Sequence, residues 1–162
     1  MDDPLTTDDA RALVADLTVY GQSVATAESL TAGLLAATLA GVPGASAVLH
    51  GGLITYTEDT KIWLAGVAPQ VLDAVGPVSA PTARALAVGA RQRCAATWGV
   101  SLTGVAGPEA HGGHPPGTVF LGIAGPIDTH VAELSLSGSR WEIRVAAVNA
   151  AISRLRALVE QQ

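Results

Sequence analysis

The stretch Ala25-Thr26-Ala27-Glu28-Ser29-Leu30-Thr31-Ala32-Gly33 decides how the rest of the chain is interpreted. It predicts the end of a strand (Ser23 to Ala27), a polar corner, and a helix that continues to Leu39. The first N–H groups of a helix lack internal partners and carry partial positive charge. The corner therefore predicts a site for an anion, or for the oxygen that becomes negative in acyl transfer. Ser29 would face that site beside the Glu28 carboxylate; the alternative is that Ser29 or Thr31 only caps the helix.

Composition favours one globular unit that associates with copies of itself. The chain has 162 residues, which predicts a single domain over residues 1–162 with a sizeable core. Hydrophobic residues make up 49% and charged residues 14%, so we expect apolar surface that a sister subunit covers, and hence a homo-oligomer. A net charge of -5 and the absence of a Lys/Arg cluster argue against nucleic-acid binding, which needs a concentrated basic face.

Several features indicate a cytoplasmic protein. The one cysteine, Cys94, has no partner for an internal disulfide and falls in an alanine-rich helical run, consistent with a reducing compartment. The segment from Met1 to Pro4 is acidic and has no apolar signal-peptide stretch. No segment holds about eighteen uninterrupted apolar residues, so we expect no membrane partner.

Hydrophobic periodicity and turn residues predict alternating helices and strands. Further helices are expected at 7–21, 58–64, 69–75, 80–97 and 139–159, and further strands at 48–56, 99–105, 118–124 and 130–136. The Gly/Pro/His-rich segment 106–117 is expected to be a loop. Strands that alternate with helices, plus one late hairpin, predict an α/β domain: a three-layer α/β/α sandwich around a mixed, mostly parallel sheet.

The polar corner and three later segments together resemble one known family. The later segments are Gly51-Gly52-Leu53-Ile54-Thr55-Tyr56 with Lys61, Leu102-Thr103-Gly104-Val105-Ala106-Gly107-Pro108, and Pro116-Gly117-Thr118-Val119-Phe120. A fifth piece, Gly138-Ser139-Arg140 with Ile143-Arg144, is similar to the family's last helix entry. The family is the C-terminal domain of the competence/damage-inducible protein CinA, which also occurs as a stand-alone nicotinamide-nucleotide amidohydrolase.

The resemblance implies a reaction on a small pyridine nucleotide. The carboxamide of nicotinamide mononucleotide would be hydrolysed to nicotinic acid mononucleotide and ammonia, with no metal or other cofactor. The family usually has Glu-Ser-Cys-Thr-Gly-Gly in the corner, so Leu30 and Ala32 are departures from its pattern. These two departures are the basis of a rival hypothesis, a catalytically silent nucleotide-binding or interaction module of the same fold.

Amide hydrolysis requires a nucleophile, a group that moves protons, and donors for the oxyanion. Because the single cysteine lies in a helix and no Gly-x-Ser-x-Gly motif is present, Ser29 is the best candidate nucleophile. Lys61 is the only lysine in the chain, and as a base it needs a lowered pKa. Tyr56 is the candidate to relay the proton or orient the lysine. The alternative is that Tyr56 packs at a sheet edge and Lys61 is solvated.

The other candidates would bind the substrate. Glu28, Thr31, Ala32 and Gly33 belong to the corner, where backbone N–H groups from Ser29 to Gly33 would form the oxyanion site. Thr103, Gly104 and Gly107 follow a strand, where open α/β sheets collect ligands; an ordinary loop is the alternative. Arg140 and Arg144 stand at a helix start and suit a phosphate, and surface pairing with Glu142 is the alternative.

His111 and His114 raise the question of a metal. Among acidic or cysteine side chains at ligand spacing, only Glu109 accompanies them in the loop. A mobile loop bordering the pocket is therefore favoured over a metal site.

Overall fold

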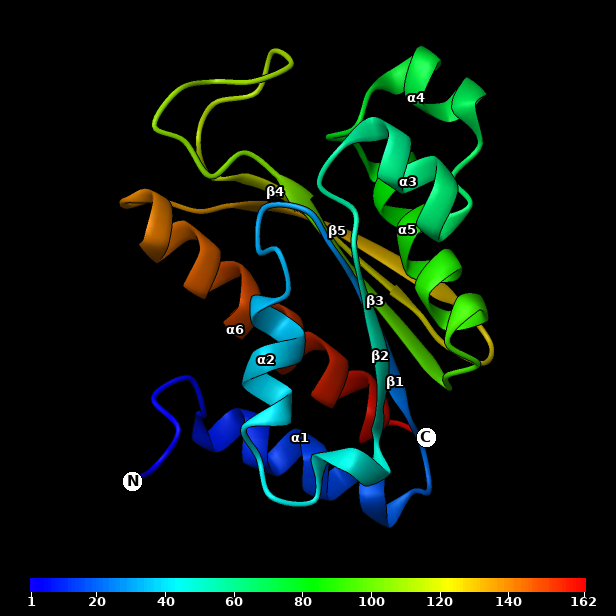
Figure 1. Cartoon of the computed structure of the whole chain (residues 1–162), viewed down its shortest axis with the longest axis vertical. Helices are drawn as coiled ribbons and strands as arrows, with labels where there is room; N and C mark the ends of the chain where they lie inside the picture. The colour runs from blue at the N-terminus through cyan, green and yellow to red at the C-terminus, as the bar shows by residue number, and fades with distance from the viewer.

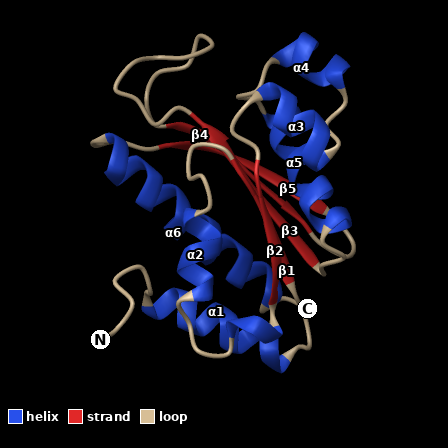
Figure 2. Ribbon diagram, viewed as in Figure 1, coloured by secondary structure: helices blue, strands red, loops and turns tan.

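The computed structural model describes residues 1–162, which form a five-stranded sheet covered by helices on both faces (Figure 1). The helices are α1 (Asp8–Val19), α2 (Leu34–Ala40), α3 (Glu58–Ala65), α4 (Pro69–Val75), α5 (Ala80–Arg93) and α6 (Arg140–Val159), with a 3-10 turn, η1 (Ala45–Ala47). The strands are β1 (Val24–Glu28), β2 (Leu49–Ile54), β3 (Trp98–Gly104), β4 (Thr118–Ala124) and β5 (Thr129–Ser135). Figure 2 shows α1, α2 and α6 on one face of the sheet and α3, α4 and α5 on the other.

The strand order is β2-β1-β3-β4-β5. β1 pairs in parallel with β2 and with β3, whereas β3 pairs with β4, and β4 with β5, in antiparallel fashion. The α/β class is confirmed, but the expectation of a mostly parallel sheet is wrong. The reason lies in the connections: β3 reaches β4 through a loop and β4 reaches β5 through a tight turn, and only a crossover connection would have kept these pairs parallel.

Side-chain caps fix where several helices begin. Thr7, Thr57, Ser79 and Ser139 each accept a hydrogen bond from a backbone N–H in the first turn of α1, α3, α5 and α6. α5 ends at Arg93, before the expected Thr97, because Ala95 adopts a left-handed φ of 48° and the Ala96 N–H donates back to the Arg91 carbonyl at 3.0 Å. None of the helices combines the length and apolar composition needed to cross a bilayer.

Two apolar clusters hold the layers together. The larger one lies between the sheet and α1, α2 and α6, and the smaller one between the sheet, α3, α4 and α5. β1 is buried along its whole length because it lies between β2 and β3. Since these three strands are parallel, their carboxyl ends meet at one edge of the sheet, where the loops that follow them come together.

Candidate active site

A pocket of about 700 Å³ opens at this edge of the sheet. Its walls are the corner after β1, the segment from the end of β2 into α3, the end of β3 with its following loop, and the start of α6. Among the lining residues are Ser29, Leu30, Tyr56, Glu58, Lys61, Thr103, Gly104, Gly107, His111 and Arg140. Both the position and the size are typical of small-molecule sites in open α/β sheets.

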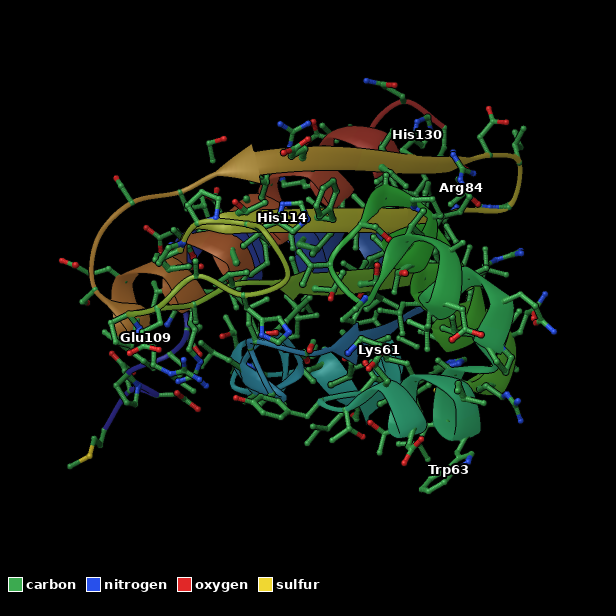
Figure 3. The ribbon with its side chains drawn as sticks, turned by 90° about the horizontal axis from the view of Figure 1, so that it is seen from above. Lys61, Trp63, Arg84, Glu109, His114 and His130 are labelled. Carbon is green, nitrogen blue, oxygen red and sulfur yellow. The ribbon has the colours of Figure 1, made fainter.

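Ser29 and Lys61 meet in this pocket. Lys61 Nζ lies 3.2 Å from Ser29 Oγ and 2.7 Å from the carbonyl oxygen of Thr55. Lys61 is 2% exposed. Figure 3 shows it pointing into the molecule from α3, whereas Trp63 on the same helix points outward. The folded chain therefore brings the only lysine against the hydroxyl of the corner.

The environment of Lys61 favours its neutral form. Burial lowers the pKa of Lys61 from 10.5 to about 8, and the nearby Glu58 carboxylate opposes part of that shift. No ion pair with a carboxylate stabilises the ammonium. A pKa of about 8 leaves roughly a tenth of the amine unprotonated at neutral pH, and a neutral amine can accept the Ser29 proton.

Glu28 holds the corner from the inside of the molecule. Its Oε1 accepts from the Leu35 N–H at 2.8 Å, and its Oε2 accepts from the Ala36 N–H at 3.1 Å and from Thr26 Oγ1 at 3.0 Å. The expectation that Glu28 and the helix start face the pocket together is therefore wrong. A buried carboxylate needs donors, and the first N–H groups of α2 supply them, so this helix start holds a carboxylate of its own chain.

Backbone donors nevertheless remain free in the corner. The Ser29 N–H donates to the Leu102 carbonyl at 2.9 Å, and the Ala32 N–H donates to the Ser29 carbonyl at 3.0 Å. The N–H groups of Leu30 and Thr31 have no hydrogen-bond partner in the chain, and Leu30 lines the pocket. The Leu30 N–H is therefore the best candidate for the oxyanion donor expected between Ser29 and Gly33, because Thr31 is fully buried and does not line the pocket.

Three other corner residues lie outside the pocket lining and shape the turn. Thr31 is fully buried, and its hydroxyl has no hydrogen-bond partner. Ala32 adopts a left-handed φ of 47°, which is uncommon for a residue with a Cβ. Gly33 has a φ of 97°, caps α2 and lies close to the side chain of Ile54. The structure thus gives Thr31, Ala32 and Gly33 no contact with the pocket.

The three residues expected at the end of β3 do line the pocket, chiefly through their backbone. Thr103 Oγ1 donates to the Pro77 carbonyl at 2.7 Å, so its hydroxyl already has a partner. A Cβ on Gly104 would approach the Thr118 carbonyl oxygen to 2.5 Å, so the packing of β3 on β4 requires glycine there. Gly107 contributes its carbonyl oxygen to a bond with α6, described next.

Arg140 lines the pocket, whereas Arg144 binds the corner from outside the pocket lining. Arg140 Nη1 donates to the Gly107 carbonyl at 2.6 Å, and its Nη2 donates to the Tyr56 hydroxyl at 3.1 Å, at the pocket wall. Arg144 lies outside the pocket lining and binds backbone carbonyls of the corner. Tyr56 lines the pocket, but no hydrogen bond joins it to Lys61. The bond between Arg140 and Tyr56 could not be predicted from the sequence, because partners 84 positions apart leave no local pattern.

The loop after β3 borders the pocket as expected. His111 lines it, and the backbone groups of His111 and His114 pair with each other, so the loop folds back on itself. The His114 ring packs edge-on against Phe120. No group of three His, Cys, Asp or Glu side chains is arranged to hold a metal ion.

Comparison with known proteins identifies the family. A family model described as the CinA C-terminal domain matches residues 7–159, and the chain belongs to this family. A CinA-like protein of Frankia casuarinae is 44% identical over 137 residues, covering 85% of this chain and 32% of that protein. A CinA-like protein of Anaeromyxobacter is 47% identical over 147 residues, covering 89% of this chain and 35% of that protein. The chain thus spans about a third of the length of the curated relatives it matches.

Solved structures show the same fold. The competence/damage inducible protein CihA from Agrobacterium tumefaciens superposes with a TM-score of 0.90 at 38% identity, covering 93% of both chains. A competence-damaged protein (CinA) superfamily protein from Escherichia coli superposes with a TM-score of 0.91 at 29% identity, covering 93% of this chain and 88% of that one.

Proposed function

We propose that this chain is a nicotinamide-nucleotide amidohydrolase, which converts nicotinamide mononucleotide to nicotinic acid mononucleotide and ammonia by serine nucleophilic catalysis. The observation that carries the proposal is the pair of Ser29 and Lys61, 3.2 Å apart in a pocket, with the amine's pKa lowered to about 8. Membership of the CinA C-terminal domain family supports the choice of substrate.

In the first half of the reaction, neutral Lys61 accepts the proton of Ser29 Oγ, and Oγ forms a bond to the carboxamide carbon. The carbonyl electron pair moves to the oxygen, where the free N–H group of Leu30 is available to stabilise the charge. The Lys61 ammonium then gives its proton to the amide nitrogen as the C–N bond breaks. Ammonia leaves, and an ester to Ser29 remains.

In the second half, water attacks the ester carbon and gives a proton to Lys61. Collapse of the tetrahedral intermediate breaks the bond to Oγ, and Lys61 returns the proton to Ser29. The acid product loses its remaining proton to solvent and leaves as the carboxylate. Tyr56 and Arg140 form a wall of the same pocket and are the candidates to contact the nucleotide. A lysine pKa of about 8 suits a group that must both accept and donate a proton near neutral pH.

Ammonia release from nicotinamide mononucleotide by the purified protein tests the proposal. We expect release of ammonia in equal amount to nicotinic acid mononucleotide. Lys61→Met should lower the rate at least about a hundredfold, because general acid and base catalysis is lost. Arg154→Gln, at an exposed position of α6, is the control and should keep the wild-type rate. A wild-type protein that releases no ammonia would overturn the proposal.

The rival function is a binding module that does not catalyse. Leu30 is the observation that favours it, because this departure from the family pattern lines the pocket, whereas Ala32 does not. Nicotinamide mononucleotide would then raise the melting temperature of the wild type, since a ligand that binds only the folded state stabilises it, and no ammonia would appear.

A further inference from the structure

Arg144 binds backbone carbonyls in the corner that carries Ser29. Its Nε donates to the Leu30 carbonyl at 2.9 Å, and its Nη2 donates to the Thr31 carbonyl at 3.3 Å. Arg144 belongs to α6, so these bonds join the last helix to the turn that follows β1. Arg144 and Thr31 are not among the residues that line the pocket, whereas Leu30 is.

The surroundings hold the Arg144 guanidinium in place. Its Cζ lies 5.7 Å from the centre of the Trp141 ring, within the range of a cation–π attraction. No carboxylate forms an ion pair with Arg144, so its charge is compensated by the two carbonyls and the Trp141 ring. Ser139 and Glu142 form a capping box at the start of α6, which fixes the helix turn that presents both side chains.

Holding these carbonyls also fixes the N–H groups of the corner. In a trans peptide the C=O and the following N–H point in opposite directions. The Leu30 carbonyl bound by Arg144 therefore sets the direction of the Thr31 N–H, and the Thr31 carbonyl sets that of the Ala32 N–H. The Ala32 N–H donates to the Ser29 carbonyl, which in turn sets the direction of the Leu30 N–H. A continuous series of bonds thus connects Arg144 to the free Leu30 N–H that lines the pocket.

We propose that Arg144 is a positioning residue for the oxyanion donor, and not the substrate-binding residue that the sequence predicts. Its guanidinium binds two carbonyls and so keeps the Leu30 N–H oriented, and its unpaired charge favours the oxygen that becomes negative. The effect of Arg144 on catalysis rests on the proposed amidohydrolase function. The restraint that Arg144 places on the backbone of the corner is independent of that function.

Two variants separate positioning from substrate binding. Arg144→Gln removes the positive charge and the paired N–H donors of the guanidinium. We expect kcat to fall about tenfold to a hundredfold while KM changes less than about threefold. Arg144→Lys keeps the charge on a single donor group, and its kcat should be intermediate. Arg154→Gln, on the same helix, should match the wild type. A raised KM with unchanged kcat in Arg144→Gln would overturn the proposal, because it would indicate a substrate contact.

Hydrogen exchange gives a measurement that needs no activity. In unliganded Arg144→Gln we expect faster exchange in peptides covering residues 29–36, with peptides from α1 unchanged. If that variant does not fold, Arg144→Lys serves the same test. Unchanged exchange in the corner would overturn the proposal. Faster exchange in the corner together with no ammonia from the wild type would sustain the positioning role and overturn the amidohydrolase function instead.

Discussion

Lys61 is a buried amine whose contacts suit a neutral group. A cation in the protein interior is costly unless a carboxylate compensates it, and Lys61 has no such partner. Its hydrogen bonds go to a carbonyl and a hydroxyl, and a neutral amine satisfies both. The molecule therefore carries an energetically unfavourable lysine at the place where the proposed reaction requires a proton acceptor.

The pH dependence follows from this lysine. Because burial lowers the pKa of Lys61 to about 8, kcat/KM should rise with pH along a limb whose apparent pKa lies near 8. The unfolded chain binds more protons between this value and 10.5, so the group makes the free energy of unfolding rise with pH across that window. A rate that is flat between about pH 6 and 9 would contradict the assignment of Lys61 as the base.

For single residues, the sequence identifies candidate site residues better than it predicts where their side chains point. Lys61 could be selected because it is the only lysine, and Ser29 because it stands at a polar corner. The orientation of the Glu28 side chain could not be predicted from the sequence, since the same carboxylate can face a pocket or a helix start. The N–H groups of Leu35 and Ala36 decide it, and their proximity exists only in the folded chain.

At the scale of elements, the turn between β1 and α2 contains a strained alanine. Ala32 has a φ of 47°, a conformation that costs an L-residue roughly 1 kcal/mol and costs glycine almost nothing. Ala32→Gly should therefore leave the melting temperature unchanged or raise it. Ala37→Gly, at an exposed position of α2, is the matched control and should lower the free energy of unfolding by about 1 kcal/mol. If thermal and urea unfolding showed equal losses of unfolding free energy in both variants, the inference that Ala32 is strained would be contradicted.

Local chemistry predicts elements better than it predicts how they pair. Thr57 and Ser139 mark helix starts in the sequence because a side-chain cap acts within one turn, and α4 has the expected bounds of Pro69 and Val75. The proportion of parallel pairing was predicted wrongly, since it depends on whether the segment 105–117 crosses over the sheet. Composition suggests a loop there, yet it does not fix which strand the returning chain joins.

At the scale of the whole molecule, the surface formed by α2 and β2 is built from a segment without formal charge. No Asp, Glu, Lys or Arg occurs from Ser29 to Thr57, the segment that forms α2 and the edge strand β2. Natural edge strands are usually protected by charges or proline, and β2 has neither. Ile54, at its end, is 52% exposed. Because the net charge is -5, copies of the chain repel one another except where charge is absent, so we propose that a second copy packs on this surface.

Light scattering coupled to size-exclusion chromatography measures this association. The wild type should have the mass of an oligomer, and Ile54→Glu should have the mass of a monomer, because two buried carboxylates would face each other across the interface. Ile127→Glu, at an 85% exposed position of the turn between β4 and β5, is the control and should remain oligomeric. A monomeric wild type, or an oligomeric Ile54→Glu, would contradict the proposed surface.

The rate of ammonia release by Ser29→Ala is the decisive measurement for the proposed attack of Ser29 on a carboxamide with Lys61 as the proton acceptor. With saturating nicotinamide mononucleotide, and with folding verified by an unchanged melting temperature, we expect a rate at least about a thousandfold below that of the wild type. A variant that retains a rate within about tenfold of the wild type would show that another group breaks the bond.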